Sequence, residues 1–362
     1  MNKKDILELR KRMKKDSACF TKICGCFVNN GKEKVTTFSH TFLNLEDEEF
    51  YKYLDIAKKT LSGTFKNNIL ELPVRAEEEE KGGRQASLIT LRNSRLTNEE
   101  VTDQFFDEII DNYDYAGSYL ILLFHDAYDV IKKGLDGKSL DESEETYEYI
   151  LCAICPVDLS KAGLGYIKSE NEIGAVERDL IVGMPVNGFV FPAFSERSSD
   201  VHHVMYYTKN PEETHDELIE GVLGCEPVMT TAECLKAFEN IINAAAGNEE
   251  DEELLFEDVQ YALNDFILEN EPDAEEESSM EITYDVMEQI LLDAGLAEDE
   301  EVKPILKEYK NTFEDGGVTA YQLVDSKAVS RAEKRHAYLD LLQENAILKE
   351  ENARLKEKLD EK

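Results

Sequence analysis

The sequence has no apolar run long enough to cross a membrane. Its longest apolar runs are Tyr119–Phe124 and Tyr149–Val157, whereas a membrane-spanning helix needs about 20 apolar residues. The opening residues, Met1–Asp5, are polar and charged and do not begin the apolar core of a secretory signal. We therefore expect a cytoplasmic protein that neither spans a membrane nor is exported.

Cysteine is scarce and odd in number. The chain has seven cysteines, which cannot all pair in a disulfide framework, so we expect reduced thiols. Cys152 and Cys155 have the spacing of a redox or zinc motif, but in a strand their side chains would face opposite ways. Cys24 and Cys26 would share one strand face. We interpret both pairs as small residues of the core.

Several signatures of enzymes are also missing. The sequence contains no phosphate-binding loop, no glycine-rich dinucleotide motif, no nucleophile elbow and no metalloprotease zinc motif. Its acidic part lacks the residue order and the glycine of a calcium-binding loop. These absences favour a protein without catalysis, and the sequence implies no cofactor.

Basic residues are few compared with acidic ones. The chain has 40 Lys and Arg against 78 Asp and Glu, a net charge of −38. Residues 248–302 contain 22 acidic residues and no basic one, whereas residues 1–15 hold seven Lys or Arg. Such a negative charge repels nucleic-acid phosphates and anionic lipids. We therefore expect a basic protein as a partner; nucleic acid held by the basic N-terminal helix is the alternative.

Two Asn-Gly pairs predict β-hairpins, because this dipeptide suits the tight turn between antiparallel strands. Asn30-Gly31 would join strands at Lys22–Val28 and Lys34–Ser39. Asn187-Gly188 would join a second pair of strands, and the apolar runs on either side of it are Ile181–Val186 and Phe189–Phe194.

The remaining patterns predict an α+β fold with a largely antiparallel sheet. Further strands are expected at Ile69–Val74, Tyr119–Phe124, Thr146–Val157 and Val201–Thr208. Capping boxes at Thr97–Glu100 and Thr230–Glu233 each begin a helix, and amphipathic patterns predict other helices at 2–15, 46–62, 252–270, 284–294 and 300–312. We expect a mixed α/β body at 1–225, an acidic helical region at 226–325 with a linker at 271–281, and a coiled-coil helix at 326–362.

The C-terminal sequence predicts a helix that pairs with a second copy of itself. Position d of a seven-residue repeat holds Leu341, Leu348 and Leu355, and position a holds Tyr338, Asn345, Asn352 and Leu359. Glu344 and Glu351 at position g would face Lys349 and Lys356 at position e of the partner. Asparagine at position a and these opposite charges favour a parallel homodimer. The alternative is a single helix whose leucines pack on the body.

A basic cluster precedes this repeat, as in zipper proteins that grip DNA. Its members are Lys327, Arg331, Lys334 and Arg335. Four charges are few for that function, and the acidic body opposes it.

The sharpest candidate for chemistry is the segment His125-Asp126-Ala127-Tyr128-Asp129, which directly follows a predicted buried strand. Ends of strands often carry functional sites, and an imidazole with two carboxylates can bind a divalent metal or transfer protons. The alternative is a turn in which Asp126 and Asp129 cap backbone N–H groups.

A second group of candidates lies near His202 and His203, in a predicted strand. Adjacent strand residues point to opposite faces, so the two histidines cannot easily share one metal, but one of them could join His125 across the sheet. The preceding loop contains Glu196 and Arg197, with Asp200 after them, and could line the same cleft. The alternative is two partly buried residues of an ordinary strand.

Several long stretches together resemble a bacterial family known as domain of unknown function forty-three seventeen. The stretches are Met1–Ile6, Tyr119–Asp129, Tyr149–Val157, Gly188–Phe194 and Tyr206–Thr208. The resemblance covers residues 1–225, after which this chain is expected to depart from a family whose members close with a strand-rich segment. It implies no activity, cofactor or site residue.

The sequence therefore favours a binding or regulatory protein of the cytoplasm that dimerises through its C-terminal helix. The alternative is a metal-assisted hydrolase that uses His125, Asp126 and Asp129, with His202 or His203 assisting.

Overall fold

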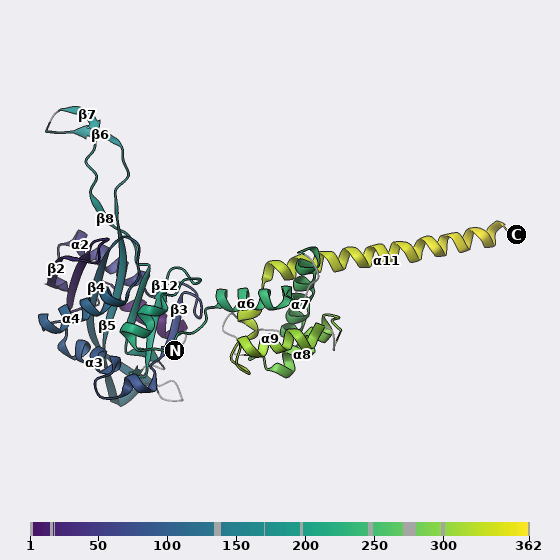
Figure 1. Ribbon diagram of the computed structural model, residues 1–362, viewed down its shortest axis with the longest axis horizontal. Helices are drawn as coiled ribbons and strands as arrows, with labels where there is room; N and C mark the ends of the chain where they lie inside the picture. Colours follow the sequence, from purple (N-terminus) through teal and green to yellow (C-terminus); the bar gives the residue numbers. More distant parts are fainter. Residues whose placement is uncertain are drawn as a thin grey trace. The chain divides into compact units, whose positions relative to one another are not determined.

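The computed structural model describes residues 3–14, 17, 19–133, 139–169, 171–195, 198–244, 249–270, 280–297 and 301–360 (Figure 1). The chain divides into two compact units, Met1–Thr230 and Thr231–Lys362. Among the described residues, none of the helices combines the length and the apolar composition that a membrane span requires.

The first unit is built on an antiparallel sheet of eight strands, which confirms the α+β class. Seven strands follow the order β2-β1-β4-β5-β9-β12-β3, and β8 pairs with the end of β5. The bounds are β1 Lys22–Val28, β2 Lys34–Thr41, β3 Ile69–Pro73, β4 Ser118–Lys133, β5 Ser139–Leu159, β8 Leu180–Val182, β9 Asn187–Phe191 and β12 His203–Thr208.

Helices cover both faces of this sheet (Figure 1). The first unit contains α1 Lys3–Arg12, α2 Asp47–Lys59, α3 Arg84–Ser94, α4 Glu99–Asn112, the short α5 Asp216–Leu218, the 3₁₀ turns η2 Phe42–Asn44 and η3 Ala76–Glu79, and the π-helical turn η4 Ile219–Leu223. α3, α4 and η4 pack on one face, and α1 and α2 pack on the other. Because both faces are buried, the central strands are continuous apolar runs and do not alternate with polar residues.

The first predicted hairpin is confirmed. β1 and β2 pair in antiparallel register, and the Asn29 Oδ1 atom accepts hydrogen bonds from the Gly31 and Glu33 backbone N–H groups at 2.9 and 3.0 Å. The turn is therefore held by an asparagine side chain that closes on its own loop.

The second predicted hairpin is wrong, because Asn187 and Gly188 are the first two residues of β9 and pair with both β5 and β12. The buried Asn187 side chain accepts a hydrogen bond from the Tyr113 hydroxyl at 2.8 Å and donates one to the Tyr206 hydroxyl at 3.0 Å. A Cβ atom on Gly188 would lie 2.5 Å from the Cys152 carbonyl oxygen. The dipeptide serves buried hydrogen bonding and close strand packing here, not a turn.

The α4 helix begins one residue later than the predicted capping box implies. The Asn98 side chain accepts hydrogen bonds from the Glu100 and Val101 N–H groups, whereas the Thr97 hydroxyl donates to the Ser94 carbonyl at 2.7 Å. Asparagine caps a helix at least as well as threonine, so the two adjacent residues compete for the same position. The preceding helix, α3, carries no capping signal and was not predicted.

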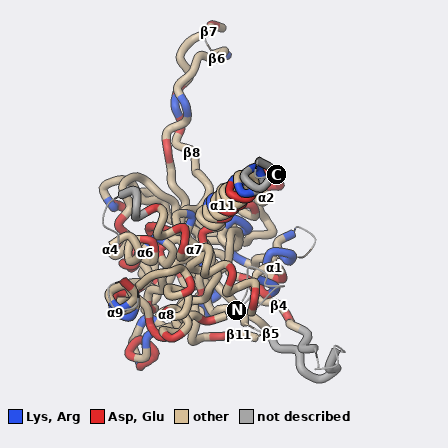
Figure 2. Tube along the Cα trace, turned by 90° about the vertical axis from the view of Figure 1, so that its right-hand side faces the viewer, with Lys and Arg blue, Asp and Glu red and all other residues tan. Residues whose placement is uncertain are grey.

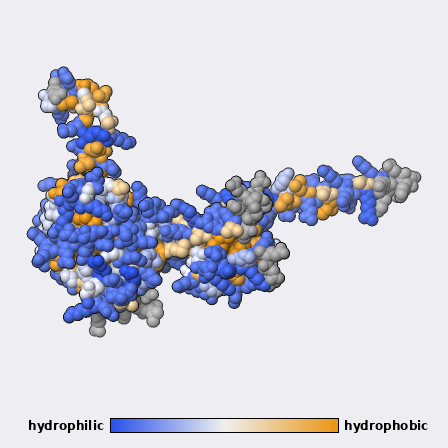
Figure 3. Space-filling view, in the orientation of Figure 1, coloured by the Kyte–Doolittle hydropathy of each residue, from blue (hydrophilic) through white to orange (hydrophobic). Residues whose placement is uncertain are grey.

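Two small ribbons complete the first unit. They are β6 Leu164–Ile167 with β7 Glu172–Ala175, and β10 Ala193–Ser195 with β11 Ser198–Asp200. The β6–β7 ribbon lies between β5 and β8 in the chain and exposes large apolar side chains, among them Leu164, Tyr166 and Ile173 (Figure 3).

The described part of the second unit is helical. It contains α6 Thr231–Asn243, α7 Glu249–Asn270, α8 Tyr284–Asp293, α9 Lys303–Thr312, α10 Ala320–Leu323 and α11 Ser326–Asp360. A separate core joins these helices, and Ala328 at the start of α11 belongs to it. Acidic residues recur along the helices of this unit (Figure 2). Most of the predicted linker at 271–281 lies outside the described residues.

Candidate functional site

His125 lies inside β4 and not at its end, because β4 continues to Lys133 and pairs with β5 along this stretch. The predicted strand end is therefore wrong. The His125 ring is buried, with 2% of its surface exposed. Its Nδ1 atom lies 2.6 Å from the Thr21 hydroxyl, and its Nε2 atom lies 2.9 Å from a Glu148 carboxylate oxygen. Both ring nitrogens are thus already hydrogen bonded within the fold.

Glu148 is the polar partner that the sequence did not reveal for this histidine. Burial raises the pKa of its carboxyl group, but the hydrogen bonds from His125 and Arg95 outweigh that effect, and the net pKa is lowered. The Arg95 Nε atom lies 2.9 Å from the same carboxylate oxygen that faces His125. The carboxylate is therefore held in its charged form by two neighbours.

Asp126 points to the other face of the sheet. Its carboxylate accepts hydrogen bonds from the Tyr149 hydroxyl at 3.1 Å, the Arg12 guanidinium at 3.4 Å and the Ala127 N–H at 2.9 Å. Arg12 also lies over the Tyr128 ring, 3.7 Å from its centroid. This buried ion pair fastens α1 to the sheet.

The structure does not assemble the predicted group of His125, Asp126 and Asp129. Asp129 shares a face with His125 but lies four residues further along the strand, about 13 Å away, where its carboxylate accepts a hydrogen bond from the Thr146 hydroxyl at 2.8 Å. One metal ion cannot reach all three side chains.

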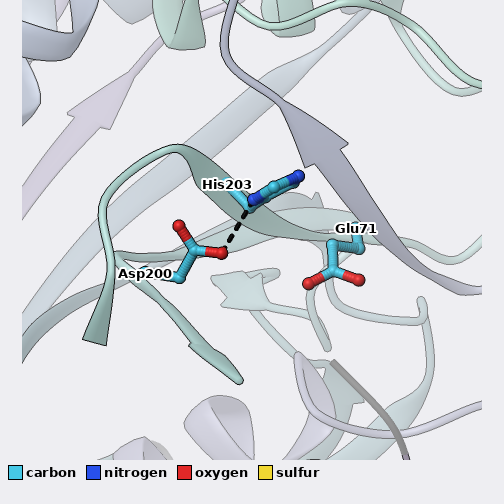
Figure 4. A group of neighbouring side chains, drawn as sticks. All are labelled: Glu71, Asp200 and His203. Carbon is cyan, nitrogen blue, oxygen red and sulfur yellow. Dashed lines mark hydrogen bonds and ion pairs between the residues drawn. The ribbon is translucent and has the colours of Figure 1, made fainter. Parts of the chain in front are cut away.

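His202 lies in the turn before β12, and His203 is the first residue of that strand, so the predicted start of the strand at Val201 is two residues too early. The His202 Nδ1 atom lies 2.7 Å from a Glu79 carboxylate oxygen, and this contact raises the pKa of His202. The His203 Nδ1 atom lies 2.8 Å from the Asp200 Oδ2 atom. Glu71 approaches His203 from β3 (Figure 4).

One group of side chains among the described residues could hold a metal ion, and it consists of Glu71, Asp200 and His203. One ligand atom from each side chain lies within 4.8 Å of the other two, and all three residues are half-buried. Sequence reasoning placed Asp200 and His203 near each other but missed Glu71. The available signal was a single carboxylate within the otherwise apolar strand Ile69–Pro73.

His125 does not join this cluster. It shares a face with Leu123, which packs under α3 and α4, whereas His203 shares a face with Met205, which packs under α1 and α2. Two strands, β5 and β9, also lie between β4 and β12. The other predicted neighbours, Glu196 and Arg197, lie outside the described residues.

The cysteines are buried, free thiols. Cys152 and Cys155 belong to the cores on opposite faces of the sheet, and Cys24 and Cys26 share one core. Burial raises the pKa of the Cys155 thiol to about 12 and that of Cys26 to about 11. These thiols stay protonated near neutral pH, as expected of core residues.

The C-terminal helix α11 exposes its apolar residues. Leu341 and Leu348 are 57% and 55% exposed, and Tyr338 is also exposed (Figure 3). Within the helical unit, the described side chains of this stripe therefore lie largely in solvent. Those of Leu355 and Leu359 lie outside the described part, although the helix backbone passes through both positions.

Two residues of the basic cluster hold α11 against α7. The buried Glu257 carboxylate lies 2.6 Å from the Arg331 Nε atom and 2.7 Å from an Arg335 nitrogen. Arg335 also pairs with Asp258, which lies 2.9 Å from the His336 Nε2 atom. The hydrogen bond to Glu257 raises the pKa of Arg331. Arg331 and Arg335 are thus engaged within the helical unit, which argues against a DNA-binding basic region.

Comparison with curated proteins finds no match to the chain. A family profile does match, and it extends well past residue 225. The expectation that the chain departs from the family there is wrong, since the acidic helices and most of α11 fall within the match. The chain belongs to the family described as Domain of unknown function (DUF4317), whose profile matches residues 1–347.

Proposed function

We propose that this chain is a non-catalytic binding or regulatory protein of the cytoplasm that forms a parallel homodimer through α11. The observation that carries the proposal is the exposure of Tyr338, Leu341 and Leu348 along one helix. Burial of apolar surface stabilises association by about 25 cal/mol per Å², so a second copy that covers this stripe would be favoured.

The pattern of polar residues selects the arrangement of the two helices. Asn345 and Asn352 occupy position a, where asparagine pairs with its own copy only in an in-register, parallel dimer. In the single chain the Asn345 side chain donates a hydrogen bond to the Leu341 carbonyl at 2.9 Å. In the dimer it would turn toward the partner's asparagine and give up this local bond.

The attachment of α11 to α7 supports a short zipper. About three heptads are marginal as an isolated coiled coil, but α11 is a helix of 35 residues whose first turns belong to the core of the bundle. Arg331 and Arg335 hold it to Glu257. The exposed part therefore continues a helix that is already nucleated, which lowers the entropic cost of pairing.

The test compares two double variants of full-length protein by light scattering coupled to size-exclusion chromatography. L341K/L348K places charges at position d, whereas L339K/I347K makes the same change at exposed apolar positions outside the seam. We expect a dimeric mass for the wild type and for L339K/I347K, and a monomeric mass for L341K/L348K. A monomeric wild type, or a dimeric L341K/L348K variant, would refute the proposal.

A groove beside α2 supports the further proposal of a basic partner. Its volume is about 730 Å³. Its lining contains three acidic residues, Glu46, Glu48 and Glu49, against the single basic residue Lys52, and Met184 belongs to its apolar part. This combination suits a peptide that presents an apolar side chain flanked by Lys or Arg.

Calorimetric titration with a Lys-rich amphipathic peptide tests this second part. E48K/E49K should weaken binding, whereas the matched change E308K on α9 of the helical unit should leave it unaltered. Equal binding by all three proteins would exclude the groove as the docking site. Among the described residues, His125, Asp126 and Asp129 do not come together in one cluster, so the alternative hydrolase built on them has no geometric support.

A further inference from the structure

We infer that Glu71, Asp200 and His203 bind one divalent transition-metal ion. The three side chains come from β3, the end of β11 and the start of β12, and they converge on one face of the sheet (Figure 4). This inference does not depend on the proposed dimer, because every ligand lies in the first unit.

The distance between two of the ligand atoms already suits one ion. The His203 Nδ1 and Asp200 Oδ2 atoms are 2.8 Å apart. Two ligands at right angles, each about 2.1 Å from a metal ion, are separated by about 3 Å. With the neutral imidazole hydrogen on Nε2, the Nδ1 lone pair and the carboxylate can therefore coordinate adjacent positions of the same ion.

Strand register brings the third ligand within reach. His203 lies opposite Pro73 in the β12–β3 ladder, and Glu71 lies two residues before Pro73 on the same face. Such diagonal neighbours are about 7–8 Å apart at their backbones, within reach of long side chains. A change of the Glu71 rotamer brings its carboxylate onto the ion, since its ligand atom lies within 4.8 Å of the other two.

The local backbone fixes Asp200 for this purpose. Its Oδ1 atom accepts a hydrogen bond from the His202 backbone N–H at 2.9 Å, and this bond leaves Oδ2 directed at His203. The His203 and Asp200 side chains are 37% and 28% exposed. An ion can thus enter from solvent, and water can complete its coordination.

The donor set indicates the class of metal. Imidazole nitrogen favours Zn²⁺, Fe²⁺, Ni²⁺ or Cu²⁺ over the oxygen-preferring Mg²⁺ and Ca²⁺. Two carboxylates and one neutral imidazole give the bound ion full charge compensation. Three protein ligands with remaining water positions are the arrangement of zinc sites that are open to small molecules.

The adjacent histidine provides a matched control. His202 also contacts one carboxylate, Glu79, at 2.7 Å. It lies in the turn before β12, and the metal-compatible cluster found among the described residues does not include it. Loss of His202 therefore removes a histidine–carboxylate pair from the same turn without removing a proposed ligand.

The experiment is calorimetric titration of Zn²⁺ into untagged, metal-depleted full-length protein, followed by the same titration of three variants. We expect one ion per chain for the wild type and for H202A, and an affinity at least about 10–100-fold lower for H203A and E71Q. An excess of Mg²⁺ should not displace the Zn²⁺. Circular dichroism spectra that match the wild type establish that each variant is folded, and E71Q, which preserves shape, is the second ligand test.

Three results would overturn the inference. They are no binding to the wild type, undiminished binding to both H203A and E71Q, or an equal loss of binding in H202A. The buried thiols become accessible to zinc only when the protein unfolds. Binding of more than one ion per chain, unchanged in H203A, would therefore indicate zinc on the thiols and would also count against the site.

Discussion

The two units of the chain differ in where they expose apolar side chains: the sheet unit exposes several on the β6–β7 ribbon, and the helical unit exposes them along α11. In the sheet unit, buried polar groups such as His125, Asp126 and Asn187 have hydrogen-bond partners within the same unit. In the helical unit, α11 leaves Leu341 and Leu348 in solvent. The charge differs as well, because residues 231–362 hold 36 Asp or Glu and only 13 Lys or Arg.

This difference indicates which surface of the chain would be stabilised by a second protein molecule. A buried polar group that is fully hydrogen bonded inside its unit requires nothing further, whereas a row of exposed leucines on one helix is typical of an interaction surface. The histidine–carboxylate pairs of the sheet unit are therefore first of all structural, and we set the half-buried cluster of Glu71, Asp200 and His203 apart from them because its three ligand atoms lie close together.

The largest loss of stability is expected when the buried Glu257 carboxylate of the helical unit loses its two arginine partners. R331A/R335A leaves the Glu257 carboxylate buried without a cation, and we expect a loss of about 3–5 kcal/mol in the free energy of unfolding. Urea denaturation of full-length protein measures it. R354A, at an exposed position further along α11, serves as the control and should behave as the wild type.

The equivalent change in the sheet unit should have a smaller effect. R12A removes one of the three groups that contact the Asp126 carboxylate, and the Tyr149 hydroxyl and the Ala127 N–H remain. We expect a loss of about 2 kcal/mol, measured by the same urea denaturation. A loss as large as that of R331A/R335A would show that Arg12 dominates the stabilisation of Asp126.

Lowering the pH should reduce the contribution that Glu148 makes to the stability of the sheet unit. Its folded-state pKa is below its ordinary value of 4.5, so its stabilising contribution is present above that value and is lost as the pH falls through the folded pKa. We expect the stability difference between wild type and E148Q to shrink below pH 4.5. Thermal denaturation at a series of pH values measures this, and a pH-independent difference would contradict it.

The smallest effect is expected at the exposed seam. L348K should change the unfolding free energy of the separated chain by less than about 0.5 kcal/mol, because the side chain is exposed there. At high protein concentration the wild type alone should gain stability through dimerisation. Thermal midpoints measured over a range of concentrations test both statements, and a concentration-independent wild type would argue against self-association.

The sequence determined those features that depend on neighbouring residues. The β1–β2 hairpin follows from an asparagine that bonds to its own loop, and the amphipathic helices follow from apolar residues at helical spacing. The faces of the cysteine pairs follow from the alternation of a strand. Each of these features is decided within a few residues along the chain.

Tertiary structure alone decided the partners of residues that lie far apart in the sequence. Asn187-Gly188 has the pattern of a turn, but its contacts with Tyr113, Tyr206 and Cys152 place it at the buried start of strand β9. His125 has the pattern of a strand-end site, but pairing with β5 extends β4 past it. Glu71 joins Asp200 and His203 only because β3 and β12 are neighbours in the sheet, and strand order is set by the packing of whole elements, which no local pattern records.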